Sequence, residues 1–489
     1  SMDTDMKHLT KHRLSAAIIG VLLFISPSVQ ANTTHHHTLT SSELKLADDS
    51  IIDSINQLGE LTVNIPNTQY FQTNNGVSVA FTPLHELPIV DISLYFNAGS
   101  AYDHQVGKSG TANMVATMLT QGTDSLSEDE FVAAKERLGI DFTSTANKDN
   151  LTLSLRSLSD QSLLNQAADL MVDAVTQPAF DDKTLQRNKN QLITSLKQKK
   201  QNPYHVASVA YHQAVYENHP YAHATTGDED SIAKIDRDEL LNFWHTFINA
   251  NNATLVITGD MTAKQAKSLA NHLTAKLPTG KSYKNTLDLT KPVKARHIHI
   301  PHNSSQTQII IGHPTSKVRT DKAGRQEFSD FSLGNEILAG GDFNARLMKT
   351  IREQKGYTYG IYGGMERLRA GGNYVVEFST DGDKAADAIL ETLHIINESL
   401  NEGITQEELE LVRLGNKNGF ANIFSSNASI HRVIGALFVA DYPKDHLNHT
   451  LNRLDNATIN SVNTALNSRI KPDEFIIITV GKTKPNLGK

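Results

Sequence analysis

Histidine is the first candidate for metal chemistry in this chain, which has 21 His and no Cys. Without cysteine, thiolate zinc sites, iron–sulfur clusters, disulfide scaffolds and thiol nucleophiles are all excluded. His297 and His299 alternate in the segment RHIHI and would share one face of a strand, where two imidazoles could bind a metal. His35, His36 and His37 lie in a Thr/Ser-rich stretch and could bind a metal weakly. The simpler interpretation is structural in both places: an exposed strand edge and a solvated linker.

Arg352 and Tyr359, in the segment IREQKGYTYG, form the second candidate. Arginine keeps its charge at any relevant pH and the phenol stays neutral, so both can donate hydrogen bonds to an oxygen that gains charge in a transition state. Residue type alone favours a surface ion pair for Arg352 at a helix end and a packed Tyr359 in a strand. Gly340 and Gly341 indicate a tight turn, because a phosphate loop would need a nearby lysine.

The elements around these residues follow the same order twice. Strands from residue 76 lead to a helix over 108–120, a helix with N-cap Ser127 that ends at Gly139, and a long polar helix over 181–201. The strand ATLVITGD ends this first series of elements. The strand EFIIITVGK ends a second series, which is offset from the first by roughly 215 to 225 residues. The pattern predicts an α+β fold made of two tandem units. Strands and helices do not alternate strictly, so we expect a mixed, largely antiparallel sheet with helices packed on one face in each unit.

The length of 489 residues predicts two to four domains, at roughly 100 to 200 residues per domain. Lys7, Lys11 and Arg13 precede the apolar residues 14–25, which are too few to span a bilayer, and small residues precede a cleavage position after Ala31. This pattern predicts a periplasmic protein without a membrane anchor after cleavage. The formal charge of -7 lacks the basic excess of a nucleic acid-binding protein. We expect a signal peptide at 1–31, a polar tether at 32–60, an N-terminal domain at 61–280, a linker at 281–294 and a C-terminal domain at 295–489.

Seven stretches together resemble one known family. They are AGSAYD, GTANMVATMLTQGT, QNP, HPYAHATTG, ATLVITGD, EILAGGDFNARL and IREQKGYTYG, in order over residues 76–481. In this order they resemble the insulinase/pitrilysin zinc metallopeptidases, the inverzincins with the signature H-x-x-E-H. The resemblance implies a clamshell-like tandem of peptidase-type units. It also makes His219 and His223 ordinary loop residues.

The zinc signature of that family is degenerate here. Two His at i and i+4 would hold Zn²⁺, a Glu would take the proton from the bound water, and a further Glu would come from the long polar helix. The matching positions are Asn113, Ala116, Thr117 and, counted back from Pro203, Ser195. None of these side chains is a good zinc ligand or a base near neutral pH. We therefore expect no metal and no cofactor in this chain.

The resemblance assigns Arg352 and Tyr359 to the substrate backbone and the developing oxyanion. It implies the non-zinc subunit of a two-chain periplasmic peptidase, with zinc in a homologous partner subunit and an unfolded peptide as substrate. Alone, such a chain would be inactive. The alternative is a catalytically inactive peptide-binding or scaffold homologue. A neighbouring gene for a homologue with an intact H-x-x-E-H would favour the first interpretation.

Overall fold

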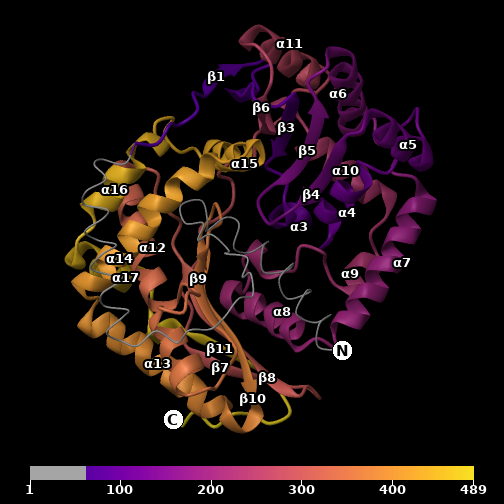
Figure 1. Cartoon of the computed structure of the whole chain (residues 1–489). Helices are drawn as coiled ribbons and strands as arrows, with labels where there is room; N and C mark the ends of the chain where they lie inside the picture. The colour runs from indigo at the N-terminus through magenta and orange to yellow at the C-terminus, as the bar shows by residue number, and fades with distance from the viewer. Residues whose placement is uncertain (1–61, 489) are drawn as a thin grey trace, which may run out of the picture.

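The computed structural model describes residues 62–488, which form two α+β units (Figure 1). The predicted signal peptide and tether, the cleavage position after Ala31 and the histidines at 35–37 lie outside these residues. We call residues 62–280 the first unit and residues 295–488 the second unit. No helix or strand lies between them, from the end of the first unit's last helix to the start of the second unit's first strand.

The first sheet has six strands in the order β1-β2-β6-β3-β5-β4. Their bounds are Gln69–Gln72 (β1), Ser78–Pro83 (β2), Ile89–Phe96 (β3), Asp141–Ala146 (β4), Leu151–Leu158 (β5) and Ala253–Gly259 (β6). β2 and β6 are parallel, and the other pairs are antiparallel. The helices of this unit are Asp103–Val106 (α3), Thr111–Met118 (α4), Glu128–Leu138 (α5), Gln161–Thr176 (α6), Asp182–Lys199 (α7), Pro203–Tyr216 (α8), Glu229–Ala233 (α9), Arg237–Phe247 (α10) and Ala263–Thr274 (α11).

The second sheet repeats this order without the counterpart of β1. Its strands, β7-β11-β8-β10-β9, are Arg296–Pro301 (β7), Gln306–Thr315 (β8), Ile361–Glu366 (β9), Gly372–Asp381 (β10) and Ile476–Gly481 (β11). The pair β7 and β11 is parallel, as β2 and β6 are in the first sheet. The helices are Lys322–Ala339 (α12), a π-helix at Met348–Gln354, Ala385–Glu402 (α13), Gln406–Phe420 (α14), Asn427–Val439 (α15), Thr450–Asn456 (α16) and Ile459–Arg469 (α17). The duplicated, largely antiparallel α+β fold predicted from the sequence is confirmed.

Local sequence signals place α5 as predicted, and two other helices differ from the prediction. Ser127 caps α5 through a capping box with Glu130, and Gly139 ends it in the left-handed conformation. The helix predicted over 108–120 is shorter, because Gly110 has a φ of 97° and α4 begins only after it. The helix that carries Arg352 is a π-helix, the wider form that occurs frequently at functional sites.

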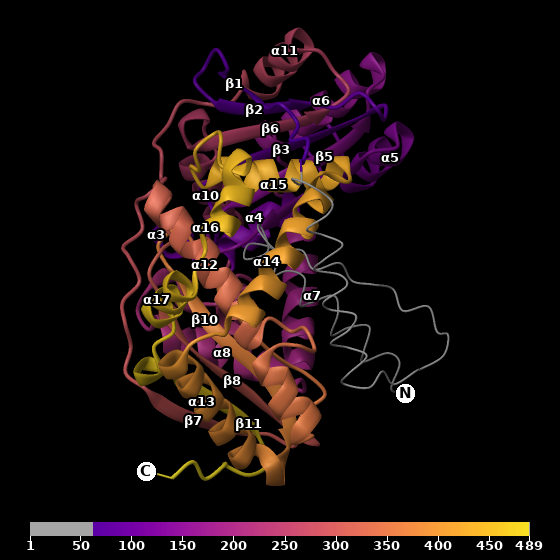
Figure 2. The ribbon, with the colours of Figure 1, turned by 60° about the vertical axis from the view of Figure 1, so that its left-hand side comes forward.

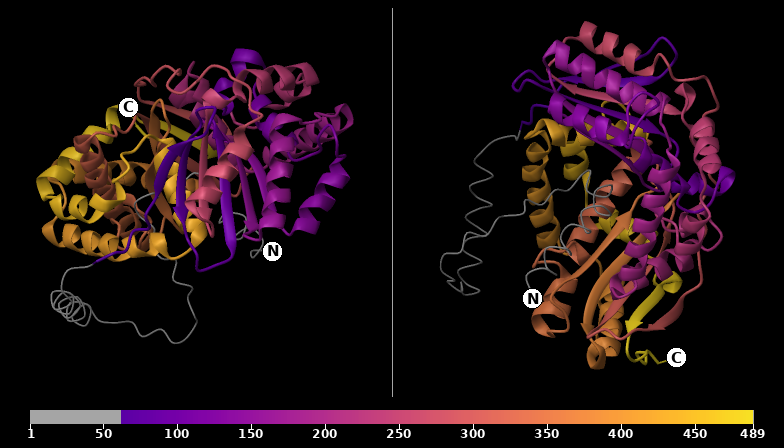
Figure 3. Two further views of the ribbon diagram at one scale, coloured as in Figure 1. Left: turned by 90° about the horizontal axis from the view of Figure 1, so that it is seen from above. Right: turned by 90° about the vertical axis from the view of Figure 1, so that its right-hand side faces the viewer.

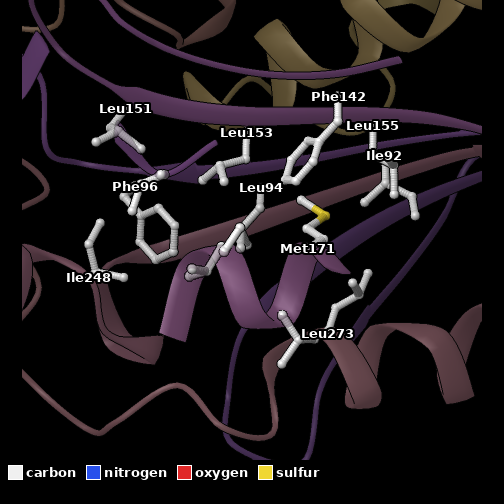
Figure 4. Close-up of a cluster of buried hydrophobic side chains, with 14 of the residues drawn as sticks. Ile92, Leu94, Phe96, Phe142, Leu151, Leu153, Leu155, Met171, Ile248 and Leu273 are labelled. Carbon is white, nitrogen blue, oxygen red and sulfur yellow. The ribbon is translucent and has the colours of Figure 1, made fainter. Parts of the chain in front are cut away.

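Each sheet buries one face against helices of its own unit. Figure 4 shows this core in the first unit, where side chains of β3 and β5 point toward Met171 of α6. The labelled residues of β3 and β5 are Ile92, Leu94, Phe96, Leu151, Leu153 and Leu155. Their alternation along the strands leaves the intervening residues on the opposite face, which in a free unit would be open to solvent.

The opposite face of each sheet carries a helix of the other unit, a feature that the sequence analysis did not predict. α8, from the first unit, packs on β8 and β11, and α15, from the second unit, packs on β6, β3 and β2. Tyr211 of α8 donates its hydroxyl to Asn373 Oδ1 at 2.9 Å, within a buried cluster that includes Ile310 and Ile478. α8 and α15 occupy equivalent places in the repeat, so the exchange is reciprocal. Figures 2 and 3 show the two units in contact from other sides.

His431 anchors α15 to the first sheet. Its Nε2 lies 2.8 Å from Ser93 Oγ and its Nδ1 lies 2.8 Å from Thr258 Oγ1, so both ring nitrogens are used. Burial lowers the pKa of His431 to about 4, from an ordinary value of 6.5. The folded chain therefore holds a neutral imidazole where the unfolded chain would take up a proton.

We predict that acid weakens the fold through this residue. Stability that is present above pH 6.5 is lost as the pH falls toward about 4, because the unfolded state binds the extra proton in that window. The linkage amounts to about 3 kcal/mol. Urea unfolding at pH 7.5 and pH 4.5 measures it, and His431→Asn should reduce the difference between the two. An unchanged difference in the variant would contradict the assignment, since His313, whose pKa is also lowered to about 4, would then account for the effect.

Among residues 62–488, no helix is long and apolar enough to cross a membrane.

Candidate functional site

The degenerate signature lies on α4, whose scaffold is intact. Asn113 and Thr117 are partly exposed on one face of the helix, whereas Ala116 is buried beneath them. Thr117 Oγ1 donates a hydrogen bond to Asn113 O at 2.8 Å, within the helix itself. Asparagine, alanine and threonine here offer no imidazole and no carboxylate. The residues present therefore do not fit a zinc ion.

Three of the stretches that carry the family resemblance meet at the start of α4. Asp103, from AGSAYD, is fully buried and accepts hydrogen bonds from the backbone N–H groups of Gly110 and Ala112, at 2.8 and 2.7 Å. His223, from HPYAHATTG, contacts the same carboxylate at 2.9 Å through Nε2. A carboxylate at the positive end of a helix is stabilising, so this arrangement fixes where α4 begins. The chain keeps the hydrogen bonds that position the signature helix, but the helix has neither the zinc ligands nor the base.

Ser195, the fourth signature position, is partly exposed on α7. α7 is tied to the end of α4 by Asn188, whose Nδ2 donates to Gln121 Oε1 at 2.6 Å. No hydrogen bond joins Ser195 to Asn113 or Thr117 within residues 62–488. In the same part of the chain, no group of three or more His, Asp or Glu side chains could hold a metal ion.

The histidine pair of RHIHI does share one face of β7, as predicted, but it is engaged within the sheet. His297 Nε2 and His299 Nδ1 both contact the hydroxyl of Thr479 on the neighbouring strand β11, at 2.8 and 2.9 Å. Both rings are half-buried, and burial followed by the charge of Lys484 lowers the pKa of each. One nitrogen of each ring is thus occupied by a hydroxyl, which supports the structural interpretation of this pair.

Arg352 and Tyr359 lie together in the second unit. Arg352, in the π-helix, donates from Nε to the backbone oxygen of Tyr359 at 3.0 Å. Its guanidinium also stacks on the ring of Phe343, 4.7 Å from the ring centroid. The Tyr359 side chain is 91% exposed, directly before the edge strand β9. Arg352 forms no ion pair within residues 62–488 and Tyr359 is not packed in a strand, so the interpretations from residue type alone were wrong.

The turn before this segment depends on glycine, as predicted. Gly341 has a φ of 85°, and a Cβ there would collide with the ring of Tyr362. A Cβ at Gly340 would meet Glu336 Cα at 2.7 Å. Phe343 follows this turn with 57% of its surface exposed, which lets its ring support Arg352. The role of Phe343 could not be inferred from the sequence, although it belongs to the quoted stretch EILAGGDFNARL.

Arg346 anchors the same segment. Its guanidinium binds Glu408 in a bidentate pair, Nε to Oε2 at 2.9 Å and Nη2 to Oε1 at 2.6 Å. It also donates to Ser399 Oγ at 3.1 Å and to the backbone oxygen of Gly403 at 3.0 Å. These bonds fasten the start of the π-helix to α13 and α14. The sequence offered only the arginine itself as a signal, because its partners lie far along the chain.

We predict that Arg346→Ala destabilises the chain by about 2 kcal/mol. The bidentate pair is three-quarters buried, so removing the arginine leaves Glu408 desolvated and unpaired. Urea unfolding measures the change. The matched control is Arg319→Ala, which breaks an exposed pair with Asp321 and should cost less than about 1 kcal/mol. Equal losses in the two variants would contradict the anchoring role.

Two family models match the chain in succession. The model described as Insulinase (Peptidase family M16) matches residues 79–229, and the model described as Peptidase M16 inactive domain matches residues 234–415. The solved structure of a peptidase M16 inactive domain from Pseudomonas fluorescens is 31% identical, with a TM-score of 0.81, and covers 86% of this chain and 98% of that one.

Two further comparisons extend this picture. The Helicobacter pylori protein named non-peptidase homolog YmxG is 26% identical over 339 residues, 68% of this chain and 75% of the relative. The periplasmic protease PqqL from Escherichia coli shares the fold at 15% identity and a TM-score of 0.71, over 94% of this chain and 48% of that one. The two family models and these relatives agree on the family of the chain. The chain belongs to peptidase family M16, and its signature helix carries none of the zinc ligands.

Proposed function

We propose that this chain is the non-zinc subunit of a periplasmic M16 peptidase and that it supplies Arg352 and Tyr359 to a cleft shared with a zinc-bearing homologous subunit. The observation that carries the proposal is the presentation of this pair: an arginine held by its neighbours beside a tyrosine that is 91% exposed. A tyrosine exposed this far contributes nothing to the core, and its hydroxyl can reach a molecule outside the chain. Contact with a substrate or a partner explains its position.

The proposed roles of the two subunits follow from the residues that this chain has and those that it lacks. α4 has no base and no ligand, so this chain cannot activate water, and a zinc ion in the partner would supply that chemistry. Arg352 and Tyr359 can donate hydrogen bonds to a carbonyl oxygen as it gains charge. Such donors are worth about 100- to 1000-fold in turnover when they are preorganised. The stacking on Phe343 and the bond to the Tyr359 carbonyl provide that preorganisation for the arginine.

An unfolded peptide is the substrate that this architecture suits. β4 and β9 each form one of the two edges of their sheet, so each presents unpaired backbone groups that can add an extended peptide as a further strand. The turns that follow these strands meet, because the backbone N–H of Arg369 donates to Asp149 Oδ2 at 2.9 Å. The two edge strands thus end at one junction, and Tyr359 lies just before the opposite end of β9.

Co-purification from the native periplasm tests the proposal. The expected result is a complex with a homologue that carries an intact H-x-x-E-H, with one zinc per heterodimer and peptidase activity only in the complex. Isolation of this chain alone, or with partners that bear no such signature, would contradict the proposal.

The periplasmic location rests on the predicted signal peptide, and the relative PqqL is described as periplasmic. N-terminal sequencing of exported material should find Asn32 as the first residue. An uncleaved, membrane-retained species would overturn this part of the proposal.

The second candidate is a peptide-binding or scaffold protein that performs no chemistry. The name of the Helicobacter relative, non-peptidase homolog, favours it. The two candidates differ in one measurement, because a scaffold would leave the turnover of any zinc-bearing homologue unchanged.

A further inference from the structure

Arg325, Arg367 and Arg453 lie near His446 in the second unit, and the charge of each acts on its imidazole. They lie on α12, in the turn between β9 and β10, and on α16. None of the three forms an ion pair within residues 62–488, whereas the neighbouring Arg469 is paired with Glu327 at 3.0 Å. Arginines without ion pairs are unusual inside a fold, because each charge that leaves water needs compensation.

The side chains form a continuous stack. The guanidinium of Arg367 lies over the ring of Phe328, at 4.3 Å, and near the ring of Tyr442, at 5.3 Å, and it donates a hydrogen bond to the Tyr442 hydroxyl. Tyr442 packs against His446 with ring centroids 4.6 Å apart. Arg453 Nη2 lies 3.3 Å from His446 Nε2. The stack thus places two guanidinium groups on either side of a Tyr–His pair.

Two nitrogen atoms at the inner end of the stack have no partner within residues 62–488. They are Nε of Arg453 and Nδ1 of His446, in side chains of residues only 5% and 2% exposed. The charge of Asp445 acts on Arg453, but its carboxylate contacts His449 at 3.1 Å and forms no ion pair with the cluster within residues 62–488. Buried donors without partners cost free energy, so this end of the stack is poised to take an acceptor.

The electrostatics agree with the geometry. Burial lowers the pKa of Arg367 to about 9 and that of Arg453 to about 10, with like charges on Arg469 and Arg325 adding to the shifts. Burial and then the charges of Arg453, Arg325 and Arg367 lower the pKa of His446 to about 2, so this imidazole stays neutral. Arg367, Arg453 and His446 are therefore in surroundings that disfavour positive charge.

We propose that Arg325, Arg367, Arg453 and His446 form a binding site for a small free oxyanion of the phosphate class. Guanidinium groups match oxyanions through paired N–H donors, which makes arginine the usual residue for such sites. Arg325 and Arg367 are partly exposed, so an ion can reach the cluster from solvent. The proposal is independent of the peptidase role, because it concerns none of the residues assigned to the shared cleft.

A bound anion would fasten the second unit beside the junction of the two units. It would link α12, the turn between β9 and β10, and the segment from Tyr442 to α16. Arg369, in the same turn, donates to the backbone oxygen of Val439 at 3.0 Å and to Asp149 of the first unit. The ion therefore should stabilise the folded chain as a whole.

Thermal unfolding of the full mature chain tests the site. Inorganic phosphate, added to a chloride buffer at constant ionic strength, should raise the Tm of the wild type by about 2 to 4 °C, and the shift should grow logarithmically with concentration. Arg367→Met should abolish the shift. Without phosphate this variant should unfold at the wild-type temperature or above it, because the substitution removes a like charge and keeps the packing on Phe328.

Arg325→Met is the second variant, and its partly exposed position makes a folding defect less of a concern; it too should lose the phosphate shift. Arg319→Met is the matched control, since Arg319 pairs with Asp321 outside the cluster and should keep the shift. The proposal is overturned if phosphate has no effect on the wild type, or if Arg367→Met and Arg325→Met retain the full shift. It also fails if Arg367→Met lowers the Tm in phosphate-free buffer, because the cluster would then be electrostatically balanced.

Discussion

Replacing Tyr359 with phenylalanine should lower the turnover of the reconstituted two-chain peptidase by about 100-fold, or about 3 kcal/mol of transition-state stabilisation. The substitution removes one hydrogen-bond donor and almost no volume. Because the side chain is 91% exposed, the variant should fold and bind its partner as the wild type does. Steady-state kinetics with a zinc-bearing homologue from the same organism measure the effect. This prediction rests on the proposed shared cleft.

The neighbouring Tyr357 provides a matched control. It belongs to the same segment, but its side chain packs against the core of the second unit. Tyr357→Phe should therefore leave turnover within about 2-fold of the wild type. A similar loss in both variants would mean that the segment is merely disturbed, and full activity of Tyr359→Phe would remove the tyrosine from the catalytic proposal.

The sequence predicts the fold well because the repeat is local. Apolar periodicity, the capping box of Ser127 and the left-handed Gly139 each act within a few residues, and they place the elements in the same order in both units. The absence of zinc ligands on α4 is equally local, since the signature occupies five consecutive positions of one helix. Such features need no knowledge of which segments meet in space.

The packing between the units could not be predicted in the same way. α8 is apolar around most of its circumference and only weakly amphipathic, which indicates burial on several sides, but nothing in its residues says that the face with Tyr211 packs on the other unit's sheet. The polar contacts that fix the exchange, His431 with Ser93 and Tyr211 with Asn373, join positions more than 150 residues apart. Only the folded chain shows that residues 62–280 and 295–488 pack a helix on each other's sheet.

Only part of the candidate site could be predicted from the sequence. Arg352 and Tyr359 were found through a sequence stretch, yet their support by Phe343 and Arg346 depends on a glycine turn and on α13 and α14. The arginine cluster around His446 was missed entirely, because its members come from three elements and have no common motif. An arginine that lacks an ion-pair partner can be recognised only when its neighbours in the folded chain are known.

Arg352→Ala should have a still larger effect than the tyrosine substitution, with a loss in kcat/KM of about 100- to 1000-fold. The arginine supplies a permanent charge, so its removal should raise KM as well as lower kcat, because that charge would hold the peptide in the ground state and in the transition state. Arg352→Lys keeps the charge but loses the planar group that stacks on Phe343 and the Nε donor to the Tyr359 carbonyl. We expect the lysine variant to recover KM more than kcat.

Arg319→Ala, an exposed arginine with no contact to the segment, is the control for these kinetics, because Arg346→Ala would release the π-helix itself. The bond between Arg352 and the Tyr359 carbonyl makes the two residues one unit, so the double variant Arg352→Ala/Tyr359→Phe should lose less than the product of the single losses. Strict multiplicativity would show that the two side chains act independently. If both single variants assemble with the partner and cleave at the wild-type rate, the pair is a relic, and the scaffold interpretation replaces the shared cleft.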